Sequence, residues 1–228
     1  MSGEKIEKSW KVQIVKKQNP LYPFIVIDNW YDSIEEKAIW KELDFLCAHP
    51  KQDLDRAEKT VVARNDDGSS KGKSFRFYID DFYQQRKLSP ILKYTYKQKS
   101  KELHGIIKEC MPYGRSFLSS NRHSSLLSYY EDNDHYDAHH DVFLWTNLIW
   151  MVREPRLFDG GDFKLNEPDV EIKLKNNRAV FFPSCYLHSV SPIKFHTQPK
   201  EIGYGRYTIT HFYYSVPLEL PPDKDENK

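Results

Sequence analysis

The stretch "YYEDNDHYDAHHD", residues 129–141, holds three histidines, five acidic residues and three tyrosines, and the apolar run "LWTNLIWM", residues 144–151, soon follows it. His139 and Asp141 are separated by one residue, so on an extended strand both side chains point to the same face. This is the spacing of a chelating pair, and it predicts a metal site if a third ligand exists. The pair alone is weak evidence, because acid-rich loops commonly lie on a solvated surface.

The segment "AVFFPSCYLHSVSPI", residues 179–193, supplies a candidate for the third ligand. It contains an apolar strand, a turn at Pro183 and Ser184, and His188 in a second short apolar run. The neighbouring sheet of a sandwich can bring such a histidine back beside the first pair. Two imidazoles and one carboxylate on one side of a metal form the facial triad of non-haem Fe(II) oxygenases, which leaves open coordination positions. These positions can hold a co-substrate and dioxygen.

A candidate anion anchor lies in "GYGRYTITHFYY", residues 203–214, where Arg206 heads an otherwise apolar, alternating strand. Arginine is costly to bury without a partner, and its planar fork matches a carboxylate with two hydrogen bonds. Thr208 lies two residues on, hence on the same face, where its hydroxyl can add a donor. Pairing of Arg206 with one of the many acidic residues explains the position equally well, as does its extension to solvent.

The composition limits the class of protein. A chain of 228 residues with 39% hydrophobic and 14% aromatic residues is long enough for one substantial core, so we expect one domain. With 34 basic and 33 acidic residues and no basic block, we expect no nucleic-acid partner. Three scattered cysteines argue against a disulfide framework and a zinc ribbon and favour a cytoplasmic location. No apolar leader and no run of about 18 apolar residues occurs, so we expect no membrane segment.

The order of local signals predicts helices first and strands later. Ser33 with Glu36 three residues on forms a capping-box pattern that predicts a helix over residues 33–48. Ser89 and Pro90 suit the N-cap and first position of a second helix that runs towards Cys110. The polar stretch "RNDDGSSKGK", residues 64–73, predicts a mobile loop between them.

Beyond residue 115 most signals are strands, in the segments "SLLSYY", "WTNLIWM", "VEIKL", "RAVFF" and "RYTITHFYY". The predicted fold class is α+β, a double-stranded β-helix (jelly roll) with N-terminal helices packed on the major sheet. Residues 1–216 are expected to form one domain, with helical and strand support in 1–114 and the jelly-roll core in 115–216. The charged tail, residues 217–228, is expected to be disordered.

These residues also resemble a known family. Tyr130, Tyr136, His139 and Asp141 match the Y-x-x-G-x-x-Y-x-x-H-x-D signature of the 2-oxoglutarate and Fe(II)-dependent dioxygenases of the prolyl 4-hydroxylase type. The segments "GGDF", "NNRAVFFPSCYLHSVSPI" and "GYGRY" resemble later motifs of that family, and their order and spacing are alike. The resemblance covers roughly residues 115–216, and "PFIVIDNWYDSIEEKAIWKEL" is similar to the family's N-terminal strand and helix.

The resemblance implies roles for individual residues. His139, Asp141 and His188 would bind Fe(II), and Arg206 would hold the distal carboxylate of 2-oxoglutarate. The remaining candidate contacts are, for the co-substrate, Tyr130, Thr208 and Trp150, and for the substrate, Tyr136 as a lining residue and His135 as an entrance residue. Trp150 stands where the family has a tyrosine, so its indole N–H would replace a phenol. Asn133 stands at the family's glycine, and asparagine tolerates a left-handed turn.

The implied activity is oxidative decarboxylation of 2-oxoglutarate coupled to hydroxylation of an unactivated C–H bond. It requires Fe(II), 2-oxoglutarate and O2, with ascorbate as an optional addition. A peptidyl proline is the leading substrate, with a free amino acid or small metabolite as the alternative. DNA-repair demethylases carry a second arginine six residues after the co-substrate arginine, where this chain has Phe212. That difference and the neutral charge balance disfavour nucleobase demethylation.

A different class of function also fits the residues. The three ligands could hold zinc in a jelly-roll module without turnover, but structural zinc normally takes four protein ligands, and Cys185 is the candidate for a fourth. For the enzyme, the loops at residues 132–141 and 64–73 are expected to form a lid over the metal. The expected partner is a peptide, a protein or a small-molecule substrate, and the expected state is a monomer or homodimer.

Overall fold

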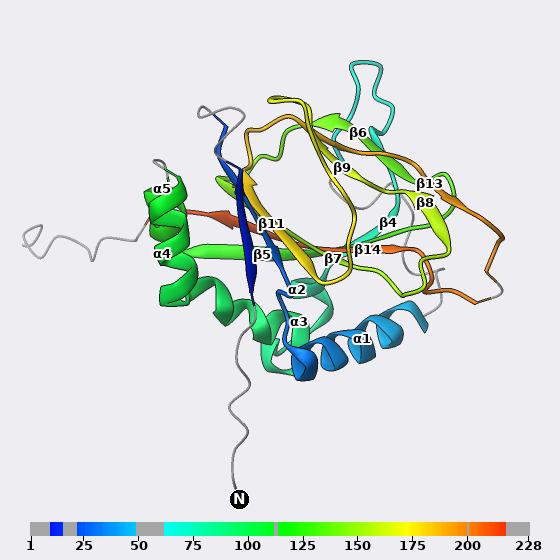
Figure 1. Ribbon diagram of the computed structural model, residues 1–228, viewed down its shortest axis with the longest axis horizontal. Coiled ribbons are helices and arrows are strands. Elements are labelled where there is room, and N and C mark those ends of the chain that lie inside the picture. The colour runs from blue at the N-terminus through cyan, green and yellow to red at the C-terminus, as the bar shows by residue number, and fades with distance from the viewer. Residues whose placement is uncertain (1–9, 16–21, 49–61, 112–113, 200, 218–228) are drawn as a thin grey trace, which may run out of the picture.

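Two antiparallel sheets face each other in the computed structural model, which describes residues 10–15, 22–48, 62–111, 114–199 and 201–217 (Figure 1). The larger, seven-stranded sheet has the spatial order β1 (Lys11–Val15), β2 (Phe24–Asp28), β11 (Arg178–Pro183), β7 (Trp145–Met151), β14 (Arg206–Tyr214), β5 (Arg122–Tyr130), β4 (Phe75–Tyr78). The five-stranded sheet has the order β10 (Val170–Ile172), β9 (Phe163–Leu165), β12 (His188–Val190), β6 (His135–His139), β3 (Gly72–Lys73). A further pair joins β13 (Ile193–Phe195) and β8 (Phe158–Gly160). This arrangement confirms the predicted jelly roll.

Strand β14 lies at the centre of the larger sheet, between β7 and β5, and is buried along nearly its whole length. Its alternate residues face different layers. Arg206 and Thr208 face the smaller sheet across a cavity. Tyr207 faces the opposite side, where its ring lies 5.9 Å from that of Trp40 and its hydroxyl 3.0 Å from the sulfur of Cys47. Both faces are therefore covered, which explains why the strand is so rich in apolar and aromatic residues.

The helices lie on the side of the larger sheet away from the smaller one (Figure 1). They are α1 (Ser33–Ala48), α2 (Ile79–Phe82), α3 (Pro90–Lys93), α4 (Lys101–Cys110) and α5 (Arg115–Ser119), with 3₁₀ turns at η2 (Arg86–Leu88) and η3 (Tyr94–Lys99). None of the helices in the described part of the chain has the length and apolar character needed to span a membrane. The segment expected to support the core, residues 1–114, contributes strands β1, β2, β3 and β4. Both sheets therefore combine strands from this segment with strands from the expected core, residues 115–216.

Helix α1 spans the predicted residues, but its cap lies one residue earlier than expected. The carboxylate of Asp32 accepts hydrogen bonds from the backbone N–H groups of Ile34 and Glu35, at 3.0 and 2.9 Å. The carboxylate of Glu35 in turn accepts from the backbone N–H of Asp32, at 2.9 Å. Asp32 and Glu35 therefore form the capping box, not Ser33 and Glu36, because an adjacent aspartate competes for the same role.

The predicted second helix begins as expected and then breaks. Ser89 caps α3, because its hydroxyl accepts from the backbone N–H of Leu92 at 3.1 Å. The chain then tightens into η3, and Ser100 caps a separate helix, α4. Within η3 the ammonium of Lys97 is buried and donates to the carbonyl of Trp30 at 2.6 Å and to the carboxylate of Glu35. This tertiary pairing overrides the local preference for one straight helix.

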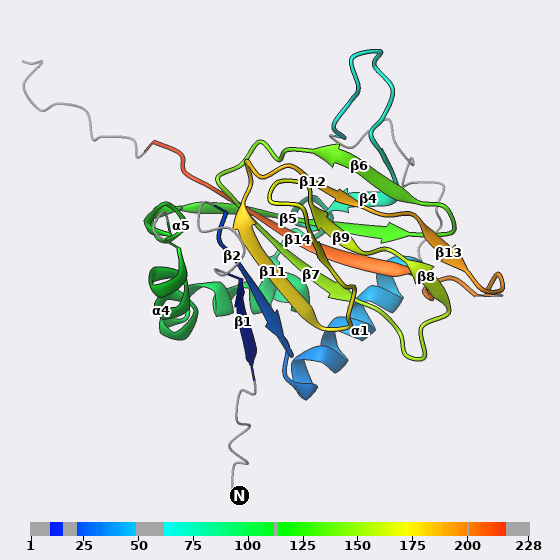
Figure 2. The same cartoon turned by 45° about the horizontal axis from the view of Figure 1, so that its top comes forward.

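The stretch predicted as a mobile loop, residues 64–73, forms a hairpin that projects beside β6 and is cyan in Figures 1 and 2. Backbone hydrogen bonds join Asn65 to Ser69 and Lys71 to Ala63, each at 2.9 Å, and the hairpin ends in β3. The predicted loop is therefore a hairpin loop held by backbone hydrogen bonds, and its mobility stays a prediction. The tail expected to be disordered lies, from residue 218 onwards, outside the described residues.

Candidate metal centre

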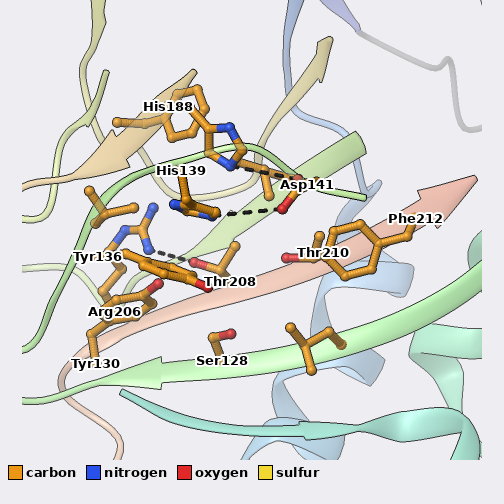
Figure 3. Close-up of a pocket in the computed structure, with 14 residues that line it drawn as sticks. Ser128, Tyr130, Tyr136, His139, Asp141, His188, Arg206, Thr208, Thr210 and Phe212 are labelled. Atoms are coloured by element: carbon orange, nitrogen blue, oxygen red, sulfur yellow. Dashed lines mark hydrogen bonds and ion pairs between the residues drawn. The ribbon is translucent and has the colours of Figure 1, made fainter. Parts of the chain in front are cut away.

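The three predicted metal ligands come from two neighbouring strands of the smaller sheet. His139 ends β6 and pairs with His188, which begins β12, while Asp141 follows two residues after His139. The Nε2 atom of His139 lies 3.7 Å from Asp141 Oδ1, and the Nε2 atom of His188 lies 3.6 Å from Asp141 Oδ2. One ligand atom from each residue lies within 4.8 Å of the others. Figure 3 shows the three side chains turned towards one point.

Each imidazole is oriented by a backbone carbonyl. The Nδ1 atom of His139 bonds the carbonyl of Asp137, and that of His188 bonds the carbonyl of Tyr186, both at 2.8 Å. A carbonyl only accepts, so Nδ1 carries the proton and Nε2 keeps a free lone pair. Burial lowers the pKa of each imidazole to about 4, helped at His139 by the nearby His188. Both rings are therefore neutral at pH 7, the form that binds metals.

Asp141 is held by hydroxyl groups that the sequence did not point to. Thr146 donates from Oγ1 to Asp141 Oδ2 at 2.7 Å, and the same hydroxyl lies 2.8 Å from that of Ser184. The backbone N–H of Asp141 donates to the carbonyl of Ser184 at 3.0 Å. Burial raises the pKa of the Asp141 carboxyl group. No motif marks these two hydroxyls, because single Ser and Thr residues are common in strands and turns.

The donor set fits an open Fe(II) site. It consists of two imidazole nitrogens and one carboxylate, the facial arrangement that leaves coordination positions free. Among the described residues, no fourth histidine, cysteine or carboxylate joins the group. Cys185, the candidate fourth ligand for structural zinc, is solvent-exposed and lies outside it. The site therefore has the composition of a catalytic rather than a structural metal centre.

Arg206 lies in the wall of the same cavity, on the larger sheet (Figure 3). Its side chain has no solvent exposure, and its guanidinium donates to the hydroxyl of Thr208 at 2.6 Å. The Nε and second terminal nitrogen have no hydrogen-bond partner among the described residues. The guanidinium carbon lies 4.8 Å from the ring centroid of Tyr130 and 5.5 Å from that of Trp150. A buried cation with unfilled donors is costly alone and suits a carboxylate.

Two glycines from the sequence motifs make room for this cation. A Cβ atom on Gly161, whose φ is +72°, would lie 3.1 Å from Arg206 Cδ. A Cβ atom on Gly205 would lie 2.0 Å from the carbonyl oxygen of Tyr130, so only glycine permits this approach of the two strands. The indole N–H of Trp150 is also buried without a partner in the described structure, but Trp150 is not among the lining residues, so its contact with the co-substrate stays a prediction.

The structure brings Tyr136, but not His135, to the cavity. The ring of Tyr136 stacks on that of His139 with centroids 3.7 Å apart. Simple alternation from His139 would have placed His135 there, but the pairing of β6 with β12 shifts register between His188 and Val190. His135 is partly exposed and bonds the carbonyl of Asn133 at 3.1 Å, so its proposed contact with substrate stays a prediction.

Other sequence expectations concern neighbouring positions. Asn133 has a φ of +63°, the left-handed conformation expected at the family's glycine. His140, between the two ligands, is exposed, and its Nδ1 bonds the carbonyl of Cys185 at 2.8 Å. Phe212, named above only as a difference from the demethylases, also lines the cavity. Further lining residues were not singled out from the sequence: Leu126, Ser128, Leu148, Phe163, Val190 and Thr210. Strand alternation could have pointed to several of them. Ser128, for example, pairs in register with Thr208, so both side chains lie on the same face of the sheet.

Residues 125–214 match the family model of the 2OG-Fe(II) oxygenase superfamily, a segment that includes all three ligands and Arg206. This match confirms the resemblance found in the sequence. No curated protein matches the chain. This segment of the chain is therefore similar to 2-oxoglutarate-dependent oxygenases.

Three solved structures illustrate the shared fold. A prolyl-4-hydroxylase from Pseudomonas putida aligns with a TM-score of 0.55 and 16% identity, over 92% of this chain and 95% of its own. The viral collagen prolyl hydroxylase of Paramecium bursaria Chlorella virus-1 gives 0.51 and 15%, over 85% and 96%. A Trichoplax adhaerens prolyl hydroxylase, in complex with a peptide fragment of the hypoxia inducible factor oxygen degradation domain, gives 0.52 and 14%, over 84% and 83%. At such identities the likeness establishes the fold alone.

Proposed function

We propose that this protein is a 2-oxoglutarate- and O2-dependent Fe(II) dioxygenase that hydroxylates an unactivated C–H bond. One observation carries the proposal: the metal triad and the unfilled guanidinium of Arg206 line the same cavity. A dicarboxylate can then reach the metal with one end and Arg206 with the other. Bound Fe(II), together with 2-oxoglutarate and O2, supplies the oxidising chemistry, while the protein supplies binding and orientation.

The protein's own residues divide the work between binding and exclusion of water. His139, Asp141 and His188 provide the donor atoms for the metal, and Arg206 with Thr208 binds the distal carboxylate of 2-oxoglutarate. We assign further co-substrate contacts to Tyr130 and Trp150, whose rings pack on the guanidinium. The rest of the lining is largely apolar, which keeps water from competing for the charged groups and strengthens their interactions with the ligand. The apolar lining residues are Leu126, Leu148, Phe163, Val190 and Phe212.

We propose a peptidyl proline as the leading substrate, with a free amino acid or small metabolite as the alternative. The likeness in fold to three prolyl hydroxylases, one of them in complex with a peptide, supports the first choice. Tyr136 is proposed to line the substrate side of the cavity, because its ring covers that of His139. Residues 132–141 were also expected to form part of a lid, but residues 135–139 form β6, so we propose that the hairpin at residues 64–73 alone closes over the metal.

Anaerobic titration with Fe(II) and then 2-oxoglutarate tests the site directly. The complex should give the weak visible charge-transfer band of 2-oxoglutarate chelated to Fe(II). His188→Ala should abolish this band, whereas His140→Ala, which removes an exposed imidazole between two ligands, should preserve it. A band that persists in His188→Ala contradicts the assignment of the triad.

Turnover is tested by succinate release against proline-containing peptides, free L-amino acids and methylated oligonucleotides, with mass spectrometry for the gain of one oxygen. We expect a peptide to stimulate succinate release and to acquire a hydroxyl on proline. Stimulation by a free amino acid would favour the alternative substrate. If iron and 2-oxoglutarate bind but no succinate forms, even with a broad metabolite extract, the non-catalytic metal-binding module is the correct description.

A further inference from the structure

A second buried guanidinium, that of Arg76, lies behind the cavity wall, over the ring of the lining residue Tyr136. Arg76 lies on β4, the edge strand of the larger sheet, and is only 5% exposed. In register it pairs with Ser128 of β5, which pairs in turn with Thr208 of β14. Directly paired residues present their side chains on the same face of a sheet. Because Ser128 and Thr208 line the cavity, Arg76 extends from the cavity-facing side.

The partners of Arg76 in the described structure are neutral. Its Nε and one terminal nitrogen donate to the hydroxyl of Ser74, at 3.1 and 2.6 Å, and its guanidinium carbon lies 4.6 Å from the ring centroid of Tyr136. Within the described ranges no carboxylate forms an ion pair with it. Arg178, by contrast, donates hydrogen bonds from two nitrogens to the carboxylate of Asp28, at 2.6 and 3.1 Å. Among the residues that the structure describes, the charge of Arg76 therefore has no counter-ion.

The position of Arg76 depends on a glycine. A Cβ atom on Gly72 would lie 2.7 Å from a terminal nitrogen of Arg76 and 2.7 Å from Cδ2 of Tyr136, so any other residue would displace one of them. Tyr136 stacks on His139 with ring centroids 3.7 Å apart. The guanidinium of Arg76, the ring of Tyr136 and the imidazole of His139 therefore form a column that ends at a metal ligand.

Tyr78 adds a hydroxyl to the same side of β4. It lies two residues after Arg76 and pairs with Leu126, another lining residue. Its side chain is half-buried, and burial together with the nearby Asp141 carboxylate raises the pKa of its phenol. The phenol is therefore protonated at pH 7 and can donate a hydrogen bond. The inner face of the edge strand thus offers one cation and one neutral donor beside the metal triad.

We propose that Arg76, with Tyr78 beside it, binds a carboxylate of the substrate, and that the substrate of this protein is an acid. This inference rests on the proposed function and narrows it. The carboxylate has two possible sources: the α-carboxylate of a free amino acid, or an acidic group of a peptide close to the hydroxylated carbon. A co-substrate bound to the metal and to Arg206 occupies Arg206 and does not compensate the charge of Arg76. We therefore assign the substrate carboxylate to Arg76 and not to Arg206.

Matched acid and amide pairs test the inference and separate the two sources. One pair is L-proline and L-prolinamide, and the other is a blocked peptide with proline followed by aspartate and its asparagine counterpart. Binding is measured by calorimetry, both to the protein alone and to the anaerobic protein that holds Fe(II) and 2-oxoglutarate. We expect the acid of at least one pair to bind about tenfold or more tightly than its amide. Arg76→Gln should remove this difference, and Arg76→Lys should restore part of it.

Arg64→Gln is the control, since it removes an exposed arginine from the neighbouring hairpin and should leave the preference intact. Equal binding of acid and amide by the wild-type protein in both pairs overturns the inference, whether or not the Arg76 variants fold. A preference that survives in folded Arg76→Gln also overturns it. Failure to bind Fe(II) or 2-oxoglutarate contradicts the proposed function instead, while the preference for acids is still measured on the protein alone.

Discussion

Lys97 and Arg206 are the two cationic side chains without solvent exposure among the described residues, and their surroundings differ. Lys97, on the helical side, donates to the carboxylate of Glu35 and the carbonyl of Trp30, with three aromatic rings within 6.0 Å. Arg206, in the cavity, has one hydroxyl partner, Thr208, and two nitrogens without any in the described structure. A buried cation that the protein satisfies stabilises the fold, whereas one that the protein leaves unsatisfied is available to a ligand.

The largest expected effect is on ligand binding at Arg206. Arg206→Met should weaken 2-oxoglutarate binding by about a hundredfold or more, since loss of one partner of a buried charged pair costs about 3 to 5 kcal/mol. The free energy of unfolding without ligand should not fall, because a largely uncompensated charge is removed. Titration of the charge-transfer band and urea unfolding measure the two quantities. A loss of stability with unchanged affinity would reverse the comparison.

At Lys97 the expected loss is in stability. Lys97→Met leaves the buried carboxylate of Glu35 without its cation, so the free energy of unfolding should fall by about 3 to 5 kcal/mol. The second substitution Glu35→Gln, made on that background, should recover part of the loss. Lys93→Met, on an exposed neighbour, serves as the control in the same urea titration. If Lys97→Met is as stable as the control, the pair contributes nothing to the fold.

The buried imidazole of His211 extends the comparison to a neutral group. Burial lowers its pKa from 6.5 to about 3, and its Nδ1 lies 2.8 Å from the hydroxyl of Ser125. The pKa of His211 is lower in the folded than in the unfolded protein. The contribution of the neutral imidazole to the free energy of unfolding is therefore complete above pH 6.5 and is lost as pH falls towards 3. At pH 5 the loss is about 2 kcal/mol. Unfolding at pH 7 and pH 5 should show less acid sensitivity in His211→Gln than in wild type, and equal sensitivity would contradict this assignment.

The smallest expected effect concerns the neutral partner of Arg206. Thr208→Val removes one hydroxyl, and a hydrogen bond to it contributes about 1 kcal/mol, so 2-oxoglutarate affinity should fall by up to about tenfold. Iron binding should not change. The same band titration, run beside Arg206→Met, measures the ratio of the two effects. A loss as large as that of Arg206→Met would show that Thr208, rather than the guanidinium, dominates binding.

The triad could be predicted because its signals are local: a one-residue spacing, an apolar run after it, and motifs in a fixed order. Strands were predicted for the same reason, through alternation and turn residues. The failures came from tertiary structure. Tyr136 lines the cavity as predicted, but the register shift between β6 and β12 leaves His135 outside the lining, and the pairing of Lys97 broke a predicted helix.

Arg76 shows the limit of pattern analysis most clearly. In "SFRFYI" the alternating Phe75, Phe77 and Ile79 define an apolar face, so Arg76 passes for the solvent side of a strand. In the structure that opposite side faces the cavity, and the arginine is buried. Alternation separates two faces of a strand but does not tell which layer covers each of them.

The orientation of the two metal-binding imidazoles by the carbonyls of Asp137 and Tyr186 has an evolutionary consequence. Every amino acid has a backbone carbonyl, so these two positions are free to mutate without loss of the orienting group. Selection then needs to retain only the ligands themselves and the path of the chain. A centre built in this way tolerates extensive drift around it, and 16% identity to a solved structure says little about whether the centre has been kept.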